Sequence, residues 1–217
     1  MIQGIIFDLD GVLVDTAKFH YLAWRRLARE WFDMEFTELD NEQFKGVNRQ
    51  ACMEILCQMA GQTLSPEKFE QGMTIKNDWY VQSVQSMTPE DVLPGAKEFV
   101  LRMKARGIKC AIGSASKNCE LVLERTGLKP LFDAVSDGLS VTKAKPDPAV
   151  FLHAASLLGV PAADCIVFED AQAGIDAAKA GGMRCHAIGS PEQLTGYDWI
   201  ADGLFCVEDV FSDKRDE

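Results

Sequence analysis

The sequence predicts an α/β protein in which a doubly wound parallel sheet carries an inserted helical module. Short apolar runs rich in β-branched residues alternate with segments of helical periodicity at the start of the chain and again beyond about residue 90, the pattern of a parallel sheet covered by helices. Between residues 15 and 90 this strand pattern is absent and long helical periods replace it. The two patterns together predict one sheet and one helical insertion.

Four apolar runs are the predicted strands of the sheet. The first covers residues 2–7 and ends at acidic residues and Gly11, as expected of a buried strand that stops at a turn. The other three cover residues 108–113, 165–168 and 183–188. The runs 108–113 and 165–168 are each followed by polar residues and then by a segment of helical periodicity. Strands that alternate with helices in this way are expected to pair in parallel.

The predicted helices have recognisable ends. One covers residues 96–106, between Pro94-Gly95 and Gly107. Another is expected to have Asp147 as its N-cap and Pro148 in its first turn, and to end at Gly159. The insertion is predicted to contain helices over 17–32, 48–60 and 66–86. An insertion after the first strand lies over the carboxyl edge of the sheet, where open α/β folds bind ligands.

The overall charge argues against two classes of partner. The formal charge is −11 and the pI is near 4.8, which opposes attraction to nucleic acid or to anionic membranes. The first residues lack a basic leader, and no apolar run reaches membrane-spanning length. Seven cysteines without a CxxC pair are typical of core residues in a reducing compartment. We therefore expect a cytoplasmic protein that binds neither nucleic acid nor membrane.

Two acidic pairs follow predicted strands. Asp8 and Asp10 end the first strand, and Glu169-Asp170 end the third, so four carboxylates are expected at one edge of the sheet. Oxygen ligands in that number, without His or Cys nearby, suit Mg²⁺ better than Zn²⁺. Each pair also has a simpler interpretation: the Asp-x-Asp-Gly run is common in turns and calcium loops, and acidic residues at a sheet edge can be solvated.

Two further residues are candidates for binding a phosphate. Ser114 lies in the Gly113-Ser114-Ala115-Ser116 run after the second predicted strand, where a hydroxyl and free backbone N–H groups at a helix start can hold an anion. Lys145 lies in a loop and can place an ammonium against the same phosphate. A capping serine and a solvated loop lysine are the alternatives.

The order of these motifs resembles the haloacid dehalogenase superfamily. Asp-x-Asp follows the first strand, Ser a middle strand, Lys precedes a helix, and Glu-Asp follows a late strand. The resemblance spans the whole chain and implies a catalytic α/β core of residues 1–14 and 91–217 with a small helical cap of residues 15–90.

The resemblance also implies a chemistry. Asp8 is the implied nucleophile, which forms an aspartyl phosphate, and Asp10 is the implied acid and base. Mg²⁺ is the implied cofactor, with Asp8, Asp10 through its backbone carbonyl, Glu169 and Asp170 as its ligands. An acid at Asp10 argues for phosphoryl transfer rather than dehalogenation.

Three stretches of the insertion resemble the sugar phosphomutases of this superfamily: residues 15–20 with Trp24, residues 45–49, and residues 76–78. Arg49 is the implied partner of the phosphate that is not transferred, with Ser116 and Asn118 on the core side. The full implied set for substrate and phosphate binding is Thr16, His20, Trp24, Gly46, Val47, Arg49, Lys76, Ser114, Ala115, Ser116, Asn118 and Lys145.

Several of these residues have simpler interpretations when taken singly. His20 is compatible with a core position on an apolar helix, Arg49 with a surface charge at a helix start, and Lys76 with an exposed lysine. Trp24 also fits helical core spacing and packing alone would explain it. By resemblance, His20 and Lys76 link sugar binding and cap closure to the placement of Asp10, and Thr16 lies at the hinge.

The reaction implied by the resemblance interconverts β-glucose 1-phosphate and glucose 6-phosphate through a bisphosphate, in a monomer. A sugar-phosphate phosphatase on the same scaffold is the alternative, and a non-enzymatic phosphoacceptor is a third hypothesis. The sequence departs from the expected pattern at Asn48, Gly113, Ala144 and Ala171. Ala144 and Ala171 lack hydroxyls that are frequent there, which bears on the positioning of the phosphate.

Overall fold

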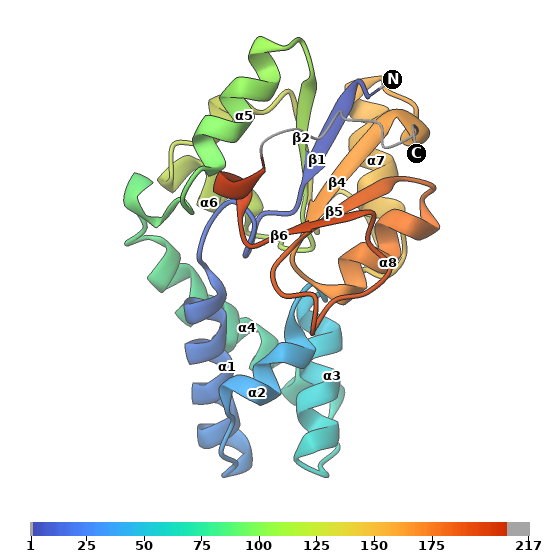
Figure 1. Cartoon of the computed structure of the whole chain (residues 1–217). Coiled ribbons are helices and arrows are strands. Elements are labelled where there is room, and N and C mark those ends of the chain that lie inside the picture. Colours follow the sequence, from blue (N-terminus) through green and yellow to red (C-terminus); the bar gives the residue numbers. More distant parts are fainter. Residues whose placement is uncertain (1, 208–217) are drawn as a thin grey trace.

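The fold is organised by one parallel sheet, as predicted (Figure 1). The computed structural model describes residues 2–207. Its sheet has six strands in the order β3-β2-β1-β4-β5-β6, all parallel. The strands are β1 (Gly4–Phe7), β2 (Lys109–Gly113), β3 (Ala134–Ser136), β4 (Cys165–Glu169), β5 (Arg184–Ile188) and β6 (Trp199–Ala201). The doubly wound α/β fold is confirmed.

The first strand lies at the centre of the sheet. Phe7, the last residue of β1, is in register with Ile112 of β2 on one side and with Phe168 of β4 on the other. The residues that follow these three strands therefore emerge at one edge. The four predicted strands are present, and β3 and β6, which the sequence analysis missed, are added at the two sides.

Two layers of helices cover the sheet. Ile5 and Phe7 pack with residues of α5 (Ala96–Ala105) and α6 (Cys119–Arg125), whereas Ile6 packs on the opposite face. That face is covered by α7 (Ala149–Leu158) and α8 (Gln172–Ala180). Because successive side chains of a strand point to opposite faces, one apolar run supplies both cores.

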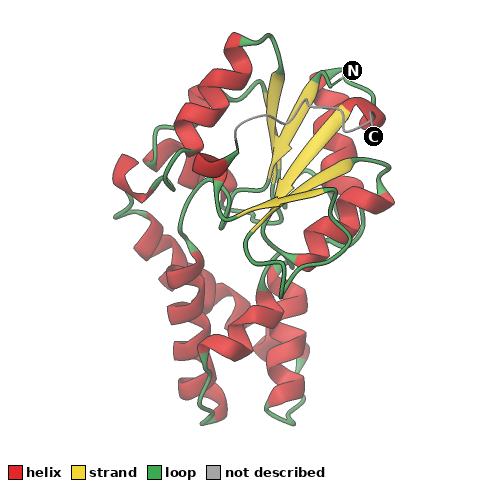
Figure 2. Cartoon of the chain, in the orientation of Figure 1, coloured by secondary structure: helices red, strands yellow, loops and turns green. Residues whose placement is uncertain are grey.

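The insertion forms a separate group of helices below the sheet, and the strand arrows point toward it (Figure 2). It consists of α1 (Ala17–Phe32), the short α2 (Glu38–Asn41), α3 (Arg49–Met59) and α4 (Pro66–Val84). These helices share an apolar cluster of their own that includes Trp24, Phe44 and Met53. The division into a core of 1–14 with 91–217 and a cap of 15–90 remains a prediction, and Met1 and residues 208–217 lie outside the described residues.

Two predicted helix starts are corrected. The helix expected from Pro148 begins at Ala149 and ends before Gly159; Asp147 is not its N-cap, although its Oδ1 accepts a hydrogen bond from the Ala149 N–H at 3.0 Å. The helix after Ser114 begins only at Cys119. Its start is delayed because Ser114 and Ser116 form a hydrogen-bonded turn first.

Single 3₁₀ turns join several of these elements: η1 (Glu42–Phe44), η2 (Pro89–Asp91), η3 (Lys129–Leu131), η4 (Ala162–Asp164) and η5 (Leu204–Cys206). Among residues 2–207, no helix has both the length and the apolar character needed to span a bilayer.

The Phe7 ring is the centre of an aromatic cluster beneath the site, so its removal tests the core. It stacks on Phe168 at 5.3 Å and meets Phe99 edge-on at 6.0 Å. We expect Phe7→Ala to lower the free energy of unfolding by about 3–5 kcal/mol, measured by chemical denaturation. Phe205→Ala, at a residue that is 61% exposed, is the control and is expected to cost about 1 kcal/mol or less. Equal losses would contradict the assignment of Phe7 to the core.

Candidate active site

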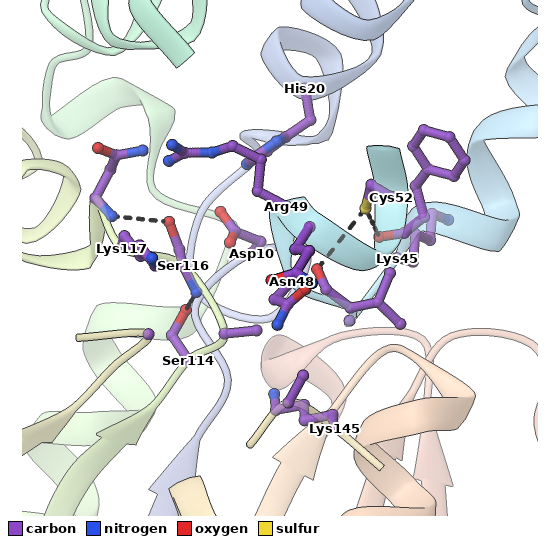
Figure 3. A pocket seen from close by; sticks show the side chains of 18 of the residues that line it. Asp10, His20, Lys45, Asn48, Arg49, Cys52, Ser114, Ser116, Lys117 and Lys145 are labelled. Carbon is purple, nitrogen blue, oxygen red and sulfur yellow. Dashed lines mark hydrogen bonds between the residues drawn. The ribbon is translucent and has the colours of Figure 1, made fainter. Parts of the chain in front are cut away.

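A cavity of about 570 Å³ lies between the carboxyl edge of the sheet and the inserted helices. Figure 3 shows its lining: Arg49 and His20 enter from the insertion, and Ser114 and Lys145 from the sheet side. Of the predicted site residues, Thr16 and Glu169 are fully buried behind the lining. The others line the cavity: Asp8, Asp10, His20, Trp24, Gly46, Val47, Arg49, Lys76, Ser114, Ala115, Ser116, Asn118, Lys145 and Asp170.

Three carboxylates meet where β1 and β4 end. One oxygen each of Asp8, Glu169 and Asp170 lies within 4.8 Å of the others. The two strands are neighbours with Phe7 beside Phe168, so the backbone fixes this proximity. Asp8 and Glu169 are buried, which makes their mutual repulsion strong because water screens it poorly.

Lys145 neutralises part of this charge. Its Nζ lies 2.6 Å from Asp8 Oδ1 and 2.8 Å from Glu169 Oε2, and its side chain is fully buried. Burial alone would lower the pKa of Lys145, but the carboxylates of Asp8 and Glu169 outweigh it and raise the pKa above the usual lysine value. Lys145 is therefore a permanent cation beside the predicted nucleophile.

The remaining negative charge fits a hard divalent cation. Burial first, and then the charge of Asp8, raises the pKa of Glu169 to about 7. Burial, Glu169 and Asp8 raise the pKa of Asp170 well above its usual range. These raised pKa values reflect the cost of holding three ionised carboxylates beside a single ammonium. A divalent cation would offset the two negative charges in excess, and the donor atoms are all oxygen, the set that Mg²⁺ prefers.

Asp10 is set apart from this cluster by a hydrogen bond. The Thr16 hydroxyl, fully buried, donates to Asp10 Oδ1. Burial and the nearby Asp8 charge raise the pKa of Asp10 to about 6, and the Thr16 hydrogen bond opposes this shift. A carboxyl group with a pKa close to neutral can both give and take a proton at physiological pH.

His20, which is half-buried, and the buried Lys76 form a pair beside aromatic rings. The Lys76 Nζ lies 2.9 Å from His20 Nδ1, 4.6 Å from the Trp24 ring centre and 5.1 Å from that of Tyr80. Lys76 is 2% exposed, so it is not the exposed lysine of the simpler interpretation. Trp24 both packs in the helical core and borders the cavity.

The turn after β2 presents hydroxyls and N–H groups to the cavity. Ser114 Oγ accepts from the Ser116 N–H at 3.1 Å, and Ser116 Oγ accepts from the Asn118 N–H at 3.2 Å. Ala115 joins the two serines and also lines the cavity. From the inserted helices, Arg49 Nη2 donates to Asn77 Oδ1 at 2.6 Å, and Asn118 at the end of the turn donates to the same oxygen at 2.9 Å.

The loop before α3 approaches the core closely at Gly46. A Cβ at Gly46 would lie 2.8 Å from the Ala171 Cβ, and the φ of Gly46 is +72°, in the left-handed region that favours glycine. Gly46 therefore lets the loop with Val47 and Arg49 rest on the segment that follows Asp170.

Among the cavity-lining residues to which sequence reasoning assigned no role are Asn77, Tyr80 and Lys117. Lys117 lies between Ser116 and Asn118, so its place in the turn was the available signal. Asn77 and Tyr80 face the cavity from α4 at a spacing of three residues from each other, one helical turn. Neither carries a charge that distinguishes it in the sequence.

The fold and the site define the class of protein. The sequence model of the haloacid dehalogenase-like hydrolases matches residues 2–182, and the chain belongs to this family of enzymes. The order of motifs on which the resemblance rested is thus found in a parallel sheet with the acidic residues at its carboxyl edge.

Within the family, the chain is similar to two kinds of enzyme. It is 38% identical over 201 residues to the β-phosphoglucomutase of Bacillus subtilis, covering 91% of this chain and 88% of that protein. The crystal structure of β-phosphoglucomutase from Clostridium difficile superposes with a TM-score of 0.92 at 34% identity, covering 96% and 94% of the two chains. A phosphorylated carbohydrates phosphatase of Thermotoga maritima is 30% identical over 184 residues, 84% of this chain and 82% of that protein.

The buried Lys76 makes a prediction about pH. Burial lowers the pKa of Lys76 to about 7, and the charge of Arg49 adds to this effect. An exposed lysine has a pKa of about 10.4. Between these two pKa values, Lys76 carries a proton in the unfolded chain but not in the folded chain. Burial of Lys76 therefore lowers the free energy of unfolding by its full amount below pH 7, and by less as the pH rises. We expect Lys76→Met to raise the Tm more at pH 6 than at pH 9. Thermal melts at both values check this, and an equal or opposite difference would contradict it.

Proposed function

We propose that this protein is a phosphomutase that interconverts β-glucose 1-phosphate and glucose 6-phosphate through β-glucose 1,6-bisphosphate. The observation that carries the proposal is that one cavity has phosphate-binding groups on two sides. Lys145 and Ser114 lie on the sheet side with Asp8, and Arg49 approaches from α3. Two phosphates on one sugar need two such sites. The similarity to β-phosphoglucomutases supports the choice of sugar.

In the proposed reaction, Asp8 attacks the phosphorus and becomes an aspartyl phosphate. Asp10 gives a proton to the leaving oxygen and then takes one from the sugar hydroxyl that accepts the phosphoryl group. Its raised pKa supports both steps. Lys145, 2.6 Å from Asp8, and Ser114 hold the phosphate oxygens as charge develops.

We propose Mg²⁺ as the cofactor, held by Asp8, Glu169, Asp170 and the backbone carbonyl of Asp10. The cluster of three carboxylates is the basis for this assignment. When bound, the ion supplies positive charge that screens the approach of an anionic nucleophile to an anionic phosphate.

The helices around the cavity supply binding energy and exclude water in this proposal. We propose that His20 and Lys76, which contact each other, link sugar binding to the placement of Asp10. Thr16, at the start of α1, donates a hydrogen bond to the Asp10 carboxylate. Gly46 and Val47 close the loop over the sheet edge. Residues from the core and from the insertion of one chain line the cavity, which supports a monomer as the working unit. We propose that it works in the cytoplasm.

A sugar-phosphate phosphatase is the second candidate, favoured by the similarity to a phosphorylated carbohydrates phosphatase. It would use the same Asp8 and Asp10, with water as the acceptor. A non-enzymatic phosphoacceptor, by contrast, has no use for an acid at Asp10 or for Arg49 in the cavity.

³¹P NMR distinguishes the mutase from the phosphatase. The purified protein is incubated with Mg²⁺, β-glucose 1-phosphate and a trace of the bisphosphate. We expect glucose 6-phosphate to accumulate without inorganic phosphate, and both signals to stay constant when EDTA replaces Mg²⁺. Inorganic phosphate as the main product would establish the phosphatase instead. A constant spectrum with Mg²⁺ present would exclude both activities on this substrate.

Replacing Asp10 separates the acid from the nucleophile. Asp10→Asn removes the proton donor but keeps the size of the side chain and a hydrogen-bonding oxygen for Thr16. We expect turnover to fall by about 10²-fold or more, followed by the same NMR assay, with Asp8→Asn as the fully inactive reference. Unchanged turnover in Asp10→Asn would show that Asp10 is not the acid.

A further inference from the structure

Asn77 connects two groups that come from different parts of the chain. Its Oδ1 accepts a hydrogen bond from Arg49 Nη2 at 2.6 Å and one from Asn118 Nδ2 at 2.9 Å. The guanidinium of arginine can only donate, so the carboxamide of Asn77 must present its oxygen here. That oxygen then requires the nitrogen of the Asn118 carboxamide, which fixes the orientation of both amides.

The three residues lie on three separate elements. Arg49 is the first residue of α3, Asn77 lies in the middle of α4, and Asn118 precedes α6 in the core. All three line the same cavity. The hydrogen bond from Asn118 to Asn77 therefore joins the inserted helices to the core at the wall of the cavity.

We propose that Asn77 is a positioning residue that holds Arg49 and Asn118 together as one set of donors for the phosphate that is not transferred. The proposal rests on the mutase function above, because only that reaction requires a second phosphate site. One neutral oxygen accepts one donor from each residue. Arg49 keeps its remaining N–H groups, and the second amide hydrogen of Asn118 also remains, for an anion.

The neutrality of Asn77 matters for this role. A carboxylate at the same place would accept the same two hydrogen bonds but would also cancel the charge of Arg49, which then attracts a phosphate less strongly. The methyl side chain of alanine at position 77 would leave the charge of Arg49 unchanged but would hold neither Arg49 nor Asn118 in place. Asn77→Asp and Asn77→Ala thus disturb the same site in two different ways, and both weaken the binding of the second phosphate.

Two substrates separate this site from the nucleophile. β-Glucose 1-phosphate, reacting with phosphorylated enzyme, places its own phosphate in the second site, whereas acetyl phosphate brings only the group that Asp8 receives. We expect Asn77→Ala to raise KM for β-glucose 1-phosphate roughly tenfold, as for loss of one charge-assisted hydrogen bond, and Asn77→Asp to raise it at least as much. The rate at which acetyl phosphate phosphorylates Asp8 is expected to stay within about twofold.

Two further variants make the test specific. Gln82→Ala removes an exposed amide from the same helix and is expected to leave both measurements unchanged. In an Arg49→Ala background, Asn77→Ala is expected to raise KM by clearly less than in the wild type, because only Asn118 is then left for Asn77 to position. Alanine is a better helix former than asparagine, so Asn77→Ala is expected to fold, and a thermal melt checks this.

The outcomes separate the two proposals. If the wild type converts β-glucose 1-phosphate and Asn77→Ala leaves KM for this substrate unchanged, the role of Asn77 is overturned and the mutase stands. The same holds if Asn77→Ala slows the reaction with acetyl phosphate by as large a factor as it raises that KM. An additive effect in the Arg49→Ala background also overturns it. If the wild type reacts with acetyl phosphate but does not convert β-glucose 1-phosphate, the mutase proposal fails, and the role of Asn77 fails with it.

Discussion

The repulsion among Asp8, Glu169 and Asp170 is the constraint on which the rest of the structure depends. Their oxygens lie within 4.8 Å of one another, and burial makes this arrangement costly without compensating charge. The central position of β1 between β2 and β4 imposes it, and Lys145 relieves it in part. The same unbalanced charge that destabilises the site makes it suited to a metal ion and a reactive carboxylate.

The inserted helices complement this site with charges of the opposite sign. Arg49 and Lys76 enter the cavity from α3 and α4, and both are partly or fully removed from water. A formal charge of −11 means that the overall field of the protein repels an anion such as the proposed sugar phosphate, so local cations are needed to attract it. Gly46 lets the insertion come close enough, because any side chain there would meet Ala171.

The sequence predicted the large and charged features of the structure but not the small and neutral ones. The helix over 17–32 was predicted with the bounds it has, because its apolar spacing is regular. The strands β3 and β6 have three residues each, too few to form a pattern. Asp147 was wrongly predicted to be the N-cap. An aspartate before Pro148 fits the N-cap pattern equally well whether the helix begins at Pro148 or, as in the structure, at Ala149. Asn77 has no charge, and its partners Arg49 and Asn118 lie 28 and 41 positions away, so only the fold reveals it.

The central place of β1 also determines when the protein can become active during its synthesis. Asp8 is made first, yet the lysine that neutralises it lies 137 positions later, and the neighbouring strand β4 begins only at Cys165. The four inserted helices have their own apolar cluster and can collapse early on the ribosome. The first strand must wait, with Ile5, Ile6 and Phe7 unpaired on both sides. A nascent chain therefore carries Asp8, the proposed nucleophile, through most of translation without its lysine partner.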